Sequence, residues 1–182
     1  MNTTIKYLIA SLLIIISLVL GFLYSGFYPI GADNKHNALT FWVLETLRTQ
    51  SIARASKDID VPSLEGSQLL LSGGADYNDM CAGCHLQPGQ KESDMSIGLY
   101  PKPPNLTLAA KDHGHDHGEG AHDDPDVIAS QQFWVIKHGI MASGMAAFGP
   151  THDDERIWAM VAFLQKLPEL TPAQYQIITA RQ

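Results

Sequence analysis

The only two cysteines of the chain stand three positions apart, and a histidine follows the second one directly. These residues are Cys81, Cys84 and His85, in the stretch YNDMCAGCHLQPG. Three kinds of site use thiols at this spacing: a thioredoxin-like redox pair, half of a structural zinc site, and the attachment motif of a c-type haem. In the third kind, each thiol bonds one vinyl group of the haem and the histidine binds the iron.

The rest of the sequence discriminates among these three kinds of site. A thioredoxin-like pair needs a βαβ context, and the sequence has no alternating strand pattern around the motif. A structural zinc site needs four ligands; the chain has no second cysteine pair, although a histidine from a loop could contribute. Haem attachment uses both thiols and leaves none free to oxidise outside the cytoplasm. The residues favour one covalently bound haem c with His85 as the proximal iron ligand.

The N-terminal residues indicate the compartment. Residues 7–30 include no charged side chain, and a helix needs about 20 apolar residues to span a membrane. Three aromatic residues between positions 24 and 28 stand at the far end, where such side chains favour the membrane–water interface. We expect a single-pass anchor over residues 1–32. The alternative is a signal peptide that is cleaved near Ala32.

Charge predicts the orientation of this anchor and the kind of partner. Lys6 is the only basic residue before the apolar segment, so the positive-inside rule places the haem domain on the periplasmic side of the cytoplasmic (inner) membrane. All 19 acidic residues follow the segment, against 11 of the 12 basic ones. This balance argues against nucleic acid, and against an anionic membrane surface, as partners. A basic or mixed-charge partner is expected instead.

Hydrophobic periodicity and helix-end signals predict the elements that position the motif. Helices are expected over residues 37–57, 63–80 and 126–138, from a cap at Thr151 to Leu167, and after Thr171. Residues 90–108 are expected to form a proline-rich loop. The prediction is an all-α fold with long loops, divided into an anchor (1–32), a membrane-proximal helix or linker (33–62) and a haem domain (63–182). Helix 37–57 would lie on the membrane, pack on its own domain or face another subunit.

From about Leu64 to Leu167 the chain resembles the class I cytochrome c family. Gly73 and Tyr77 stand eight and four positions before the first cysteine, like the small and aromatic residues of the family's first helix. The segment MVAFL at 160–164 is similar to the apolar part of the family's last helix. The resemblance implies a cytochrome c fold, in which these two helices cross closely at the glycine and an aromatic pair fills the crossing.

The resemblance also implies a partner for the proximal histidine. Pro104-Asn105-Leu106 is similar to the family's Pro-x-Leu, in which the proline carbonyl accepts a hydrogen bond from the histidine Nδ1–H and the leucine packs on the haem. Such a bond fixes the tautomer and the orientation of a ligating histidine. Pro101 and Pro103 are rivals for the role of Pro104.

The second axial ligand is expected from a methionine loop. The stretch GMAAFG at 144–149 resembles the family's Gly-Met-Pro-Ala-Phe-Gly, so Met145 is the expected distal ligand. Ala146 replaces the family's proline, whose fixed φ would stiffen the loop. Met141 is therefore a rival ligand, with Met95 behind it. His138 is expected to stabilise a helix end instead of binding iron.

A histidine-rich insert occupies residues 111–124 and has no counterpart in the family pattern. Its histidines, with acidic residues between them, are His113, His115, His117 and His122. Imidazole and carboxylate suit zinc, nickel or copper(II), so the insert is a candidate second metal site. The simpler interpretation, which we favour, is a solvated acidic loop.

These observations predict a one-electron carrier with a single haem c and His/Met ligation, held at the outer face of the cytoplasmic membrane. Such a protein is not an enzyme by itself, although it can be a subunit of a redox enzyme complex. Its expected partners are a membrane redox complex or a soluble redox protein. The alternative function is metal handling or haem-based sensing, which would use the histidine-rich insert or a labile sixth ligand.

Overall fold

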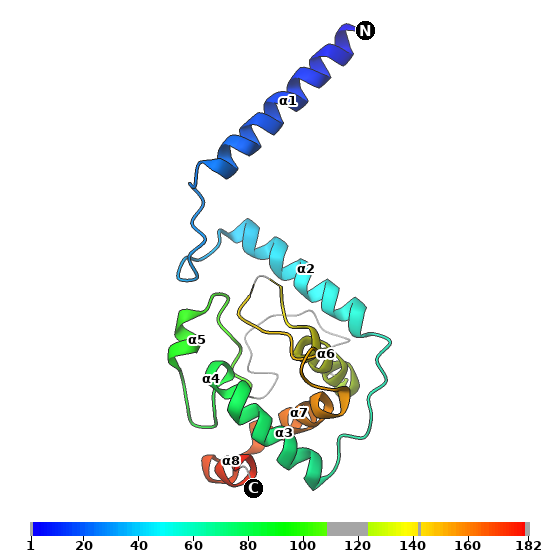
Figure 1. Cartoon of the computed structure of the whole chain (residues 1–182), viewed down its shortest axis with the longest axis vertical. Helices are drawn as coiled ribbons and strands as arrows, with labels where there is room; N and C mark the ends of the chain where they lie inside the picture. Colours follow the sequence, from blue (N-terminus) through cyan, green and yellow to red (C-terminus); the bar gives the residue numbers. More distant parts are fainter. Residues whose placement is uncertain (1, 109–123, 142, 181–182) are drawn as a thin grey trace. The chain divides into compact units, whose positions relative to one another are not determined.

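The computed structural model describes residues 2–108, 124–141 and 143–180, and the regular elements in these residues are all helical (Figure 1). The helices are α1 (Thr3–Tyr24), α2 (Ala38–Ser56), α3 (Ser67–Met80), α4 (Ala82–His85), α5 (Asp94–Gly98), α6 (Pro125–His138), α7 (Asp154–Lys166), the 3-10 turn η2 (Leu167–Glu169) and α8 (Pro172–Thr179). The all-α prediction is therefore confirmed.

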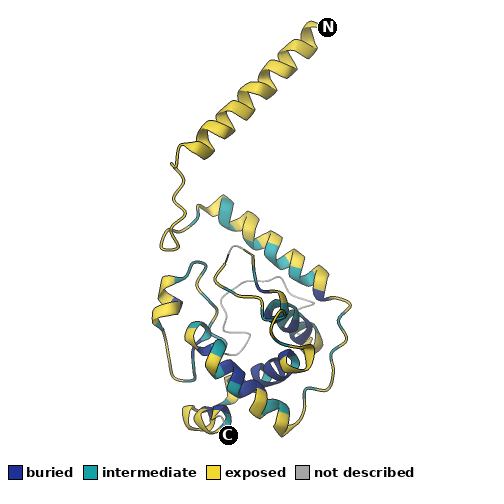
Figure 2. Cartoon of the chain, viewed as in Figure 1, coloured by how far each residue is buried: buried dark blue, intermediate teal, exposed yellow. Residues whose placement is uncertain are grey.

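Helix α1 belongs to a unit of its own, Met1–Asn34, and is long and apolar enough to cross a membrane. Its mean hydropathy is 2.5, and none of its residues is buried (Figure 2). The side chain of Asn2 caps its first turn by accepting a hydrogen bond from the backbone N–H of Thr4. An apolar helix with no protein cover needs a lipid environment, which supports a transmembrane helix at this position.

The second unit, Lys35–Gln182, is built around the crossing of α3 and α7. Gly73 lies at the crossing, and a Cβ atom added there would lie 1.9 Å from the backbone oxygen of Ala159. Any larger residue would therefore push the two helices apart. The close approach predicted for Gly73 is confirmed.

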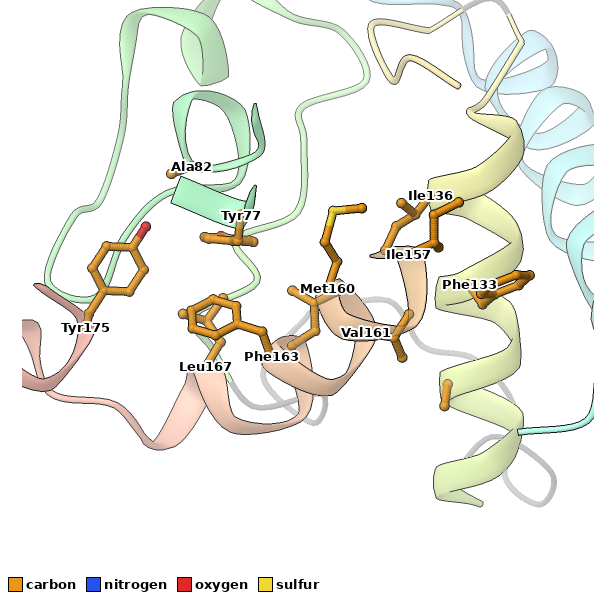
Figure 3. Packing of buried hydrophobic residues seen from close by; sticks show 12 residues of the cluster. Tyr77, Ala82, Phe133, Ile136, Ile157, Met160, Val161, Phe163, Leu167 and Tyr175 are labelled. Carbon is orange, nitrogen blue, oxygen red and sulfur yellow. The ribbon is translucent and has the colours of Figure 1, made fainter. Parts of the chain in front are cut away.

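Aromatic and aliphatic side chains from α3, α7 and α8 fill the core beside this crossing (Figure 3). The rings of Tyr77 and Phe163 have centroids 5.2 Å apart, and Tyr175 lies edge-on to Tyr77 at 6.3 Å. Ile157 and Val161 of α7 are completely buried in the same cluster. The aromatic pair expected at the crossing is thus present, and α8 adds a third ring to it.

Two helices begin later than predicted. Helix α3 starts at Ser67 and not at residue 63, because Gly66 before it has φ of 136°, a value that a helix cannot contain. Helix α7 is capped by Asp153, whose side chain accepts a hydrogen bond from the N–H of Arg156, and not by Thr151. The N–H of Thr151 instead donates to the carbonyl of Phe148 and closes the preceding turn.

Helix α2 packs against α6 within the second unit. Asn37 caps its start, and Ser56 near its end is buried. The rings of His36 and Phe41 contact the ring of Tyr100, with centroids 5.4 and 6.4 Å away. Three arrangements were considered for helix 37–57: on the membrane, on its own domain or against another subunit. One side of α2 packs on its own domain.

Candidate functional site

The two cysteines lie where α3 passes into the single turn α4. The N–H of Cys81 donates to the carbonyl of Tyr77 at 2.8 Å, and the N–H of His85 donates to the carbonyl of Cys81 at 2.8 Å. Both thiols are free and half-buried. The motif is thus one compact helical turn joined rigidly to the core helix α3, which places the thiols and the imidazole together.

The surroundings of the thiols argue against the thioredoxin-like interpretation. Burial, together with the charge of Asp76, raises the pKa of the Cys81 thiol to about 12, so that it is not a thiolate nucleophile at neutral pH. The described residues also lack the strands of a βαβ unit. Among the residues that the structure describes, no group of three or more histidine, cysteine or acidic side chains could hold a metal ion such as zinc.

His85 is oriented by the loop after α5. Its Nδ1 lies 2.8 Å from the carbonyl oxygen of Pro104. A carbonyl can only accept, so Nδ1 carries the proton and the lone pair of Nε2 is left for a metal. Burial lowers the pKa of His85, although the bond to Pro104 opposes that shift, and the neutral ligand form is favoured. The N–H of Leu106 donates to the carbonyl of His85 at 3.3 Å, which ties the same loop to the motif.

Tyr77 has a second role, which the sequence did not reveal. Its buried hydroxyl donates to the carbonyl of Leu86 at 2.7 Å and lies 3.2 Å from that of His85. Leu86 has a positive φ of 72°, which is unusual for a branched residue and ends α4 abruptly. The position of Tyr77 four residues before Cys81 was the only sequence signal for this tyrosine. It predicted the packing of the ring and not the hydrogen bonds of the hydroxyl.

Backbone hydrogen bonds hold the methionine loop against the end of α6. The carbonyl of Met145 accepts from the N–H of Ile140 at 3.1 Å, and the N–H of Phe148 donates to the carbonyl of Ile136 at 3.0 Å. Gly139 has φ of 66°, and a Cβ atom there would lie 2.7 Å from the backbone of Ala147. These contacts restrain the loop although Ala146 stands where the family has proline.

The candidate iron ligands differ in exposure. Met145 is half-buried and packs against the core cluster, whereas Met141 is 97% exposed and Met95 is 55% exposed. His138 is exposed at the end of α6, where its ring lies 4.9 Å from that of Trp134. The four histidines of the histidine-rich insert lie outside the described residues. Burial therefore favours Met145 among the candidates.

These residues suit a c-type haem. The chain offers two free thiols, an imidazole with Nε2 as the coordinating atom, and a thioether from a separate loop. Half-buried apolar side chains that suit the surroundings of a haem pack against the core cluster: Leu106, Phe148 and Trp158. Nitrogen and thioether donors together are the ligand set of electron-transferring haem.

The comparison with protein families agrees with this site. The family model described as "Cytochrome C oxidase, cbb3-type, subunit III" matches residues 68–164, more than half of the chain and all of the motif and methionine loop. Comparison with curated proteins and with solved structures gave no match. Proteins of the cytochrome c type bind covalent haem c, and the spacing of Cys81, Cys84 and His85 is that of one haem. The chain therefore belongs to the family of cytochrome c oxidase, cbb3-type, subunit III, and is a c-type cytochrome that transfers electrons through haem.

Proposed function

We propose that this cytochrome is a one-electron carrier with His85 and Met145 as axial ligands, held by α1 at the outer face of the cytoplasmic membrane. The observation that carries the proposal is the hydrogen bond from His85 Nδ1 to the carbonyl of Pro104 at 2.8 Å. It holds the imidazole in the tautomer that presents Nε2 as a ligand, directly beside two free thiols.

When bound, the haem supplies the iron couple that accepts and releases one electron. Cys81 and Cys84 would attach the haem to the chain, and His85 and Met145 would both ligate its iron. Because a thioether is a soft ligand that favours ferrous iron, Met145 raises the reduction potential. With both positions filled, no substrate can bind the iron, so electron transfer is the function left to the site.

We propose a membrane redox complex as the partner, in preference to a soluble protein. The matching family is named for a subunit of cbb3-type cytochrome c oxidase, and α1 is a candidate membrane anchor. A tether keeps the haem domain near membrane complexes and raises its effective concentration there. The cytochrome would then deliver electrons to the catalytic part of such a complex, or receive them there.

Carbon monoxide binding to the reduced full-length protein tests this function. A site closed by Met145 should bind carbon monoxide slowly or not at all and exchange electrons rapidly with a soluble redox dye. The Met145→Ala variant should bind carbon monoxide readily, because it opens one axial position. Rapid binding by the unaltered protein would instead favour haem-based sensing and would refute the closed carrier site.

A further inference from the structure

One side of helix α2 is covered by the rest of the second unit, and the other side carries large apolar residues that the described residues leave uncovered (Figure 2). The exposed fractions are 69% for Leu39, 63% for Trp42 and 62% for Leu47. Val43 and Leu44 are also exposed. Because Leu39, Val43 and Leu47 recur every four residues, they form a continuous stripe along the helix.

Charge distinguishes this stripe from the rest of an acidic domain. Between positions 35 and 57 the only acidic residue is Glu45, and it forms an ion pair with Arg48. Arg54 is exposed about two turns beyond Leu47 on the same side of α2. Lys35 stands before the helix, and Lys57, directly after it, pairs with Asp58. The acidic average of the domain repels an anionic surface, but within α2 itself the two basic residues Arg48 and Arg54 outnumber the single acidic residue Glu45.

The covalent path from α1 limits how far α2 can be from a membrane. The connecting segment, residues 25–37, is about a dozen residues long, and an extended chain gains at most about 3.6 Å per residue. If α1 spans a bilayer, α2 therefore begins within about 45 Å of the lipid surface. A helix with Trp and Leu on one side and Arg near its end has the composition of helices that lie in a membrane interface.

We propose that the stripe of α2, formed by Leu39, Trp42, Val43, Leu44 and Leu47, binds the anionic lipid surface of the membrane that α1 spans. The apolar side chains enter the boundary between headgroups and acyl chains, and Arg54 pairs with lipid phosphate. Because the opposite side of α2 packs on α6 and on Tyr100, this contact fixes how the haem domain faces the membrane. The proposal goes beyond electron transfer and does not depend on which residues bind iron.

Site-directed spin labelling of the full-length protein in lipid nanodiscs tests the proposal. A label is placed at Leu47→Cys and, separately, at Leu39→Cys; Ile177→Cys on α8, where the native side chain is 74% exposed, is the matched control. Collisions with oxygen, which concentrates in lipid, are compared with collisions with a neutral nickel chelate, which stays in water. The haem spectrum verifies folding, and unaltered protein shows whether Cys81 or Cys84 takes up label.

In nanodiscs that contain phosphatidylglycerol, both α2 labels should collide more with oxygen than with the chelate, and the label at Ile177 should show the opposite order. One basic residue near an anionic surface changes binding by about fivefold. Arg54→Gln, or nanodiscs of pure phosphatidylcholine, should therefore lower the fraction of α2 labels that contact lipid, although α1 keeps the protein in the nanodisc. Equal behaviour of the α2 and Ile177 labels would overturn the proposal. So would α2 labels that are shielded from both reagents, a result that indicates contact with a second copy or another protein.

Discussion

His85 is held from two directions by groups that do not bind iron themselves. The carbonyl of Pro104 accepts from its Nδ1, and the hydroxyl of Tyr77 binds the carbonyls that follow it at the end of α4. If His85 binds the iron as proposed, the restraint of its ring and its backbone would keep its reorganisation small when the iron changes charge. The precision of the site therefore depends on Tyr77 and Pro104 as well as on the motif.

Replacing Tyr77 by phenylalanine should destabilise the domain while keeping the packing of the ring. The variant leaves the buried carbonyl of Leu86 without its donor, and the expected loss is about 1–3 kcal/mol of unfolding free energy. Urea denaturation followed by circular dichroism measures it. Tyr100→Phe is the control, because Tyr100 makes its contacts with His36 and Phe41 through its ring. Equal stability of the Tyr77→Phe variant and the unaltered protein would show that this hydroxyl has no structural role.

The same tyrosine predicts a pH dependence. Burial raises the pKa of Tyr77 well above its ordinary value of 10.0, so the folded state binds a proton that the unfolded state releases. The protonated Tyr77 therefore adds to the unfolding free energy in full below about pH 10, and this stabilisation is lost as the pH rises further. Between about pH 9 and pH 11, the unfolding free energy of the Tyr77→Phe variant should therefore fall less than that of the unaltered protein. Parallel curves for the two proteins would contradict the assignment.

Asp76 and Arg156 join α3 to the start of α7 by a two-pronged ion pair. The Nε and terminal nitrogen of Arg156 donate to the two oxygens of Asp76 at 2.6 and 2.8 Å, and Asp76 is 5% exposed. Arg156→Gln should lower the unfolding free energy by about 1.5–3 kcal/mol, since hydrogen bonds to a buried charge are lost. Lys166→Gln removes only an exposed pair and should cost less than about 1 kcal/mol. Similar losses in the two variants would refute a special role for the pair between the exposed Arg156 and the buried Asp76.

At the scale of elements, the crossing of α3 and α7 sets where the motif lies. Gly73→Ala should destabilise the domain by about 1–3 kcal/mol or more, because the new Cβ would overlap the backbone at Ala159 and the helices must separate. Gly98→Ala is the matched control, since a Cβ there would meet nothing within 4 Å. Denaturant unfolding compares the two. A Gly73→Ala variant as stable as the control would contradict the close crossing.

The crossing was predicted through the resemblance to the cytochrome c family. Gly73 and Tyr77 match the family's small and aromatic residues before the first cysteine, and the apolar run at 160–164 matches the family's last helix. The ends of the helices were less predictable, because they depend on backbone torsion angles and hydrogen bonds at single residues. Thr151 and Asp153 can both cap a helix, and only the turn at Phe148 decides between them.

Contacts between distant segments could not be predicted from periodicity. The rings of His36 and Phe41 meet Tyr100 only because the chain returns to α2 after more than forty residues. The hydrogen bond from Tyr77 to the carbonyl of Leu86 likewise occurs where Leu86 has a positive φ, for which the sequence has no signal. The partner of His85 was named at Pro104 through the family resemblance, and the spacing alone left Pro101 and Pro103 open.

At the scale of the whole molecule, the chain consists of an apolar helix long enough to span a membrane and a haem domain that is compact by itself. A chain that starts at Lys35 should therefore fold and stay in solution, with the same unfolding free energy as the full-length protein in detergent. Circular dichroism and sedimentation measure both properties. Aggregation or loss of helix in the shortened chain would show that α1 supports the fold.

The anchor and its orientation are open to a direct test in membranes. If α1 stays attached, mass spectrometry of the membrane fraction should give the intact chain, and protease added to spheroplasts should remove the haem domain. A mature chain that begins near residue 33 would show that the apolar segment is a cleaved signal peptide. A haem domain protected in intact spheroplasts would show the opposite orientation.

We propose that Met145 closes the haem site as the second iron ligand beside His85. Optical spectra of the oxidised and reduced full-length protein test it most directly, with Met145→Ala compared with Met141→Ala. The unaltered protein should be low-spin with the near-infrared band of sulfur-ligated ferric iron, and Met145→Ala should lose that band. Met141→Ala should keep it, because Met141 is 97% exposed and Met145 packs on the core. A high-spin unaltered protein, or a band lost with Met141 and retained without Met145, would contradict the account.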